Sequence, residues 1–92
     1  MKISDLHISL LTKMWHKGAI GMNYKPVEKL MSGIPSDQRG DAKEAMDELV
    51  QEGICAFRTG KGEKLAAILS EQVEKVREIL RGEVPDYVLN LH

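Results

Sequence analysis

Apolar residues near the start of the chain recur at helical spacing and predict a helix over residues 4–16. A short apolar run at 19–22 lies between helix stop and start signals, and it predicts a brief strand beside a later hairpin. A second helix is expected to start at Asn23 or Pro26, because proline is tolerated in the first turn of a helix, and to end near Gly33. Its expected apolar stripe consists of Val27, Leu30 and Met31.

The next part of the chain predicts a helix that leads into a β-hairpin. The helix is expected to begin between Ser36 and Asp41, the two candidate N-caps, and to end at Gly53. Its expected buried face consists of Ala42, Ala45, Met46 and Leu49. Two apolar runs then flank a glycine-rich turn, in which Gly60 and Gly62 are expected to take the positive φ values of a tight hairpin.

A fourth amphipathic helix is predicted after the hairpin, capped by Ser70 and closed at Gly82. Residues 1–82 then form one domain, and residues 83–92 form an apolar tail that packs on the domain or on a partner. These elements predict an α+β domain, mostly helical, with a three-helix core, a small antiparallel sheet and a C-terminal fourth helix.

Composition narrows the class of protein. The 92 residues are 42% hydrophobic and 29% charged, which is typical of one globular domain. No apolar run reaches the roughly 18–20 residues that cross a bilayer, and no secretory signal is recognisable, so we expect a cytoplasmic protein. A single cysteine, Cys55, excludes an internal disulfide and fits a small apolar side chain in a strand.

The distribution of charge is uneven although the net charge is only −1. Residues 57–64 hold three basic side chains and one acidic side chain. Residues 36–52 hold six acidic and two basic side chains. The affinity of proteins for DNA comes largely from basic side chains that neutralise phosphates. The acidic third helix therefore weighs against binding of that helix in a DNA groove, whereas the basic hairpin favours contact with DNA.

The order helix–strand–helix–turn–helix–strand–wing–strand–helix over residues 4–81 resembles the winged helix superfamily, including small MarR- and ArsR-type regulators. The segment Ala-Met-Asp-Glu-Leu-Val-Gln-Glu-Gly-Ile at 45–54 looks like the Leu-x-x-Leu-x-x-x-Gly-Ile/Leu end of many recognition helices. Ala-Ile-Leu-Ser-Glu at 67–71 is similar to the strand that runs into the last helix of such domains. The resemblance implies that the third helix enters the major groove and that the wing contacts the DNA backbone or minor groove.

Carried over by position, the resemblance implies DNA contacts from three elements. They are Gln38, Arg39, Gly40 and Lys43 on the third helix, Arg58, Lys61 and Lys64 on the wing, and Lys25 and Lys29 on the second helix. The alternative is that these side chains are solvated surface charges that offset acidic neighbours or protect an edge strand.

Two functions follow as expectations. The first is a DNA-binding transcriptional regulator, a homodimer through the fourth helix and the tail, with its third helices about 34 Å apart. The second is a winged helix module that presents its acidic third helix to a protein partner. The sequence shows no set of catalytic residues, no cofactor motif and no metal-ligand spacing. We therefore expect that the protein is not an enzyme and that it binds neither a cofactor nor a metal ion. Trp15 is expected to pack in the core or in a dimer interface.

Overall fold

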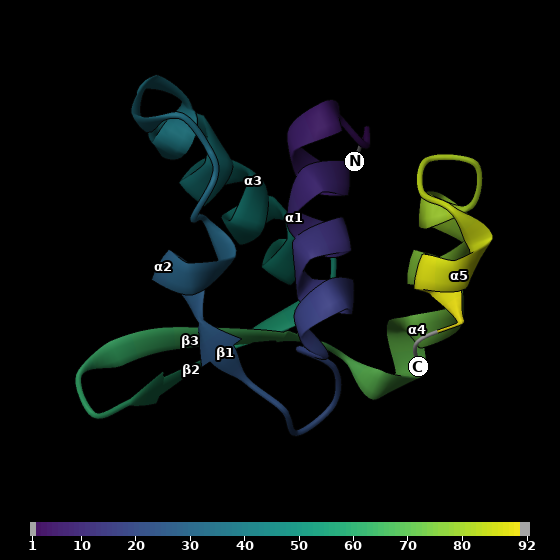
Figure 1. The fold of residues 1–92 in the computed structure, drawn as a ribbon. Coiled ribbons are helices and arrows are strands. Elements are labelled where there is room, and N and C mark those ends of the chain that lie inside the picture. Colours follow the sequence, from purple (N-terminus) through teal and green to yellow (C-terminus); the bar gives the residue numbers. More distant parts are fainter. Residues whose placement is uncertain (1, 91–92) are drawn as a thin grey trace.

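A three-stranded antiparallel sheet lies below a group of helices in the computed structural model, which describes residues 2–90 (Figure 1). The α-helices are α1 (Asp5–Lys17), α2 (Val27–Leu30), α3 (Arg39–Gln51), α4 (Val73–Leu80) and α5 (Asp86–Leu89), and the strands are β1 (Lys25–Pro26), β2 (Cys55–Gly60) and β3 (Glu63–Ile68). Two short 3-10 turns, η1 (Ser36–Gln38) and η2 (Ser70–Gln72), precede α3 and α4. The coarse α+β, mostly helical class predicted from the sequence is confirmed.

Helix α1 confirms the first predicted helix to within a residue at each end. Its start is fixed by a reciprocal capping arrangement between Ser4 and His7. The Ser4 side chain accepts from the His7 backbone N–H at 3.5 Å, and the Ser4 backbone N–H donates to His7 Nδ1 at 2.9 Å. Both interactions satisfy amide groups that have no partner inside the helix.

The strand expected at 19–22 is wrong in its position. In this segment only Ile20 forms a bridge, to Ile68, and Gly21 then turns the chain with a φ of 67°. The strand beside the hairpin is β1, which pairs with Ala66 and Leu65 of β3. Pro26 is tolerated there because β1 lies at an edge of the sheet, where a missing N–H is not needed.

Helix α2 is shorter than predicted, which separates two lysines expected on one helix. The extended backbone of Pro26 (ψ 132°) precedes the first helical residue, so Lys25 lies on β1 and Lys29 on α2. The prediction that both lysines lie on the second helix is therefore wrong for Lys25. The expected apolar stripe is confirmed, since Val27, Leu30 and Met31 are buried.

Helix α3 begins within the predicted window and buries the predicted face. Neither Ser36 nor Asp41 provides its N-cap; Gln38 occupies that position and makes no side-chain capping bond. The fourth helix differs in the same way, because Ser70 opens the η2 turn and α4 starts only at Val73. Both expected side-chain caps are replaced by a 3-10 turn that leads into the helix.

The hairpin is confirmed, but one of its turn residues is not the expected one. Strands β2 and β3 pair from Cys55–Ile68 to Gly60–Glu63, which leaves a two-residue loop. Its residues, Lys61 and Gly62, have φ values of 51° and 79°. Gly60 keeps a negative φ because it is the last paired residue of β2, and a two-residue hairpin loop needs positive φ at its two central positions.

The tail folds back on the domain (Figure 1). Helix α5 places Val88 and Leu89 in the core, and the backbone carbonyl of Val88 accepts from the indole N–H of the buried Trp15 at 2.8 Å. The tail residues 91–92 lie outside the described residues. Trp15 is thus a core residue, and the two buried tail side chains are not available to a second copy of the chain.

Candidate functional site

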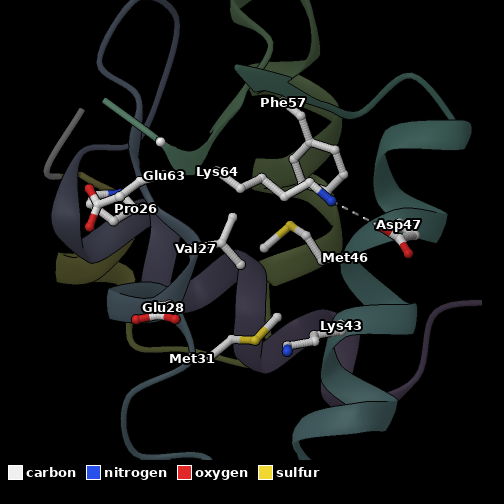
Figure 2. Close-up of a pocket in the computed structure, with 11 residues that line it drawn as sticks. Pro26, Val27, Glu28, Met31, Lys43, Met46, Asp47, Phe57, Glu63 and Lys64 are labelled. Carbon is white, nitrogen blue, oxygen red and sulfur yellow. Dashed lines mark ion pairs between the residues drawn. The ribbon is translucent and has the colours of Figure 1, made fainter. Parts of the chain in front are cut away.

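A groove of about 390 Å³ lies between α2, α3 and the β2–β3 hairpin (Figure 2). Apolar side chains from all three elements line it: Pro26, Val27, Met31, Met46 and Phe57. Charged side chains that line it are Glu28, Lys43, Asp47, Glu63 and Lys64. Two of the residues expected to contact DNA, Lys43 and Lys64, therefore meet at one groove although they come from different elements.

Lys64 is held between an aromatic ring and a carboxylate (Figure 2). Its Nζ lies 4.1 Å from the centroid of the Phe57 ring and 4.0 Å from Asp47 Oδ1. The strand register explains the first contact, since Lys64 and Phe57 are diagonal neighbours on one face of the β2–β3 pair. The Lys64 and Asp47 side chains are 58% and 56% exposed, so the ion pair contributes about 1 kcal/mol or less.

Helix α3 contributes Lys43 and Asp47 to the groove because residues four apart lie on the same helical face. The helix then continues toward the hairpin through the buried Met46 and Leu49. Near its start, Arg39 Nε donates to the backbone carbonyl of Ile34 at 3.4 Å, so this side chain lies back against the turn before η1.

Gly40 and Gln38 lie at the exposed start of α3. A Cβ placed on Gly40 meets no atom within 4 Å, and the φ of Gly40 is not positive. The fold therefore does not require glycine at this position.

The remaining basic residues do not converge on the groove. Arg58 pairs with Leu65 across the hairpin, on the face opposite Lys64, and its Cζ lies 5.1 Å from the centroid of the Tyr24 ring. Lys61 forms the exposed tip of the hairpin. Lys25 and Lys29 do not line the groove. The three wing cations are thus spread over the tip and both faces of the hairpin.

The groove carries three carboxylates and two ammonium groups, a formal balance of −1. The sequence shows that the third helix is acidic, but it does not show that Asp47, Phe57 and Glu28 lie at one site. The spacing of Lys43 and Asp47 is a signal that could have joined that pair. The contacts of Phe57 and Glu28 depend on the register of the hairpin and on the position of α2, which local sequence does not reveal.

Cys55 has a structural role. Its Sγ lies 4.0 Å from Met14 Sδ in the core, and burial raises the pKa of the thiol to about 12. A thiol that stays protonated and inaccessible is neither a nucleophile nor a metal ligand at neutral pH.

Within residues 2–90, no group of three or more His, Cys, Asp or Glu side chains is arranged to hold a metal ion. None of the helices in that range combines the length and the apolar character needed to cross a membrane. Comparisons of the chain with protein-family models, with curated proteins and with solved structures found no match.

Proposed function

We propose that the chain is a winged helix-turn-helix domain that binds double-stranded DNA through the first turns of α3 and through the β2–β3 hairpin. The order of elements supports the fold: α2 and α3 are joined by a short turn, and α3 leads into a two-stranded hairpin that pairs with the edge strand β1. In this fold α3 is the helix that would approach the major groove and the hairpin is the wing.

One observation carries the DNA proposal. Lys43 on α3 and Lys64 on the hairpin line the same groove, and Lys61 lies at the exposed hairpin tip. A sugar-phosphate backbone that passes between α3 and the hairpin would meet these three cations. Arg58 and Lys25 lie elsewhere, so the proposed contact surface is smaller than the sequence suggested.

The proposed affinity is modest because carboxylates share this surface. Asp47 already neutralises part of the charge of Lys64, and Glu44 and Asp41 are exposed on the same helix. We keep the homodimer as part of the proposal, because a dimer would double the number of basic side chains that face the DNA. With Val88 and Leu89 buried in the core, its interface would need other surfaces, such as the exposed side of α4.

The test is the salt dependence of binding to a random-sequence duplex. Replacing Lys43 and Lys61 by glutamine removes two proposed phosphate contacts, and each contact contributes about 0.9 to the slope of log K against log salt. We therefore expect the slope to fall by about 2. The matched control replaces Lys2 and Lys17, exposed lysines outside this groove and outside α4, and should leave the slope unchanged. An equal loss in the control, or no binding at about 50 mM salt, contradicts the proposal.

A second candidate is a protein-binding module, and the Lys64–Asp47 ion pair is the observation that favours it. The Lys64 ammonium of the hairpin is already paired with Asp47, and the outer face of α3 carries carboxylates. These carboxylates repel DNA and attract basic protein surfaces. The substitution Asp47→Asn separates the two candidates. Under the DNA proposal it frees Lys64 and raises the affinity for DNA. If the chain instead binds a basic protein partner through α3, Asp47→Asn lowers the affinity for that partner. In that case neither the original chain nor the variant binds DNA.

A further inference from the structure

The site occupied by Lys64 has the chemistry of a receptor for a positive charge. Its ammonium lies over the half-buried Phe57 ring, whose face carries the negative part of the ring quadrupole, and beside the Asp47 carboxylate. The chain therefore already seats a primary ammonium in the groove. We propose that this groove binds a small organic cation, an amine with an apolar body, which displaces Lys64.

The dimensions and the lining of the groove fit such a ligand. About 390 Å³ lies within the range of small-molecule sites, roughly 300–1,000 Å³. Beyond Phe57 the groove is floored by Val27, Met31 and Met46, and methionine side chains adapt their shape to apolar ligands (Figure 2). The apolar body of an amine would lie on this floor while its charged end occupies the position of the Lys64 ammonium.

Once Lys64 is displaced, the charge of the groove favours a cation over an anion. Glu28, Asp47 and Glu63 line it, against Lys43 and Lys64. Lys64 is more than half exposed and has a flexible four-carbon stem, so it can move to solvent without disturbing the hairpin. Once it has moved, three carboxylates face one remaining ammonium, and a ligand cation restores the balance.

This binding does not depend on the proposed DNA contact, and it is tested without DNA. The probes are 2-phenylethylamine, which is an ammonium ion at neutral pH, and its uncharged counterpart 2-phenylethanol. Binding is followed by NMR through the methyl groups of Val27, Met31 and Met46 and the ring of Phe57. We expect saturable shifts with the amine and at least about tenfold weaker binding of the alcohol, a difference that reports the charge.

Three variants assign the binding to the proposed contacts. Asp47→Asn should weaken binding of the amine several-fold and leave the alcohol unaffected. Asp41→Asn is the matched control, since Asp41 is exposed on α3 but does not line the groove, and it should change neither affinity. Lys64→Met removes the internal competitor and keeps an unbranched side chain, so it should tighten binding of the amine.

Several results would overturn the inference. They are equal affinity for the amine and the alcohol, shifts centred on another face of the domain, or no shift at about 10 mM amine. A Lys64→Met variant that folds normally but binds the amine no better would also overturn it, because the ammonium of Lys64 would then not occupy the ligand site. None of these outcomes depends on whether the chain binds DNA.

Discussion

His7 of α1 and Glu48 of α3 are joined by a hydrogen bond of 2.9 Å between Nε2 and Oε1. The same histidine accepts the Ser4 backbone N–H at Nδ1, so Nδ1 carries no proton and Nε2–H is the donor to the carboxylate. One imidazole therefore caps the start of α1 and ties that helix to α3. The pair links the first turn of α1 to the C-terminal part of α3.

A double-mutant cycle tests this bond. Replacing His7 and Glu48 by alanine, singly and together, should give a coupling energy of about 1 kcal/mol in urea unfolding, as for a hydrogen bond to a charged group that is partly exposed. The single variant Glu44→Ala, one turn earlier on the exposed side of α3, should change stability by less than about 0.5 kcal/mol. A coupling energy of zero would show that the two side chains are not bonded in solution.

Packing of the tail predicts a contrast between two neighbours on α5. Leu89 is buried and Tyr87 is 71% exposed. We expect Leu89→Ala to lower the free energy of unfolding by about 2 kcal/mol, since it leaves a cavity beside the core, and Tyr87→Ala to lower it by less than about 0.5 kcal/mol. Urea titration with Trp15 fluorescence measures both. Equal effects would mean that α5 does not pack as described.

The hairpin tip predicts that stability and DNA binding move in opposite directions. Lys61 has a φ of 51°, which costs a side-chain-bearing residue about 1 kcal/mol and suits asparagine better. Lys61→Asn should therefore raise the free energy of unfolding by about 0.5 kcal/mol while weakening DNA binding. Lys61→Gln loses the same charge without the backbone preference, so it should weaken DNA binding and leave stability nearly unchanged. A stabilised Gln variant would refute the backbone argument.

The parts of the fold that follow from local periodicity could be predicted from the sequence. The buried faces of α1 and α3 repeat at helical spacing, and a helix with one apolar face has only one side to bury. The hairpin could also be predicted from the sequence, because few structures other than a hairpin fit a glycine turn between two apolar runs. Its finer geometry was not, since the choice of Lys61 over Gly60 as a turn residue depends on strand register.

Contacts between distant segments could not be predicted. Strand β1 exists only because Lys25 and Pro26 meet β3, and nothing in those two residues alone indicates a strand. The tail docks through the buried side chains of Val88 and Leu89 and through the Val88 carbonyl, which accepts from the Trp15 indole N–H far away in the sequence. The groove has the same origin: Asp47, Phe57 and Lys64 each look like ordinary surface or strand residues until the hairpin register brings them together.

Burial of Cys55 predicts a specific loss of stability in alkaline solution. Desolvation raises the pKa of this thiol from 9.0 to about 12, so the folded state keeps the proton that the unfolded state releases. Because the unfolded chain then binds fewer protons, stability falls as pH rises, from about pH 9 until the folded pKa near 12.

The size of this effect is isolated by comparison with Cys55→Ala, which lacks the thiol but keeps every other titrating group. Between about pH 8 and pH 10 the free energy of unfolding of the original chain should fall by about 1.4 kcal/mol more than that of the alanine variant. At neutral pH, iodoacetamide should react with the native thiol far more slowly than with the urea-unfolded chain, because reaction requires an accessible thiolate. Parallel pH profiles for the two chains, or rapid labelling of the native protein, would place Cys55 outside the core.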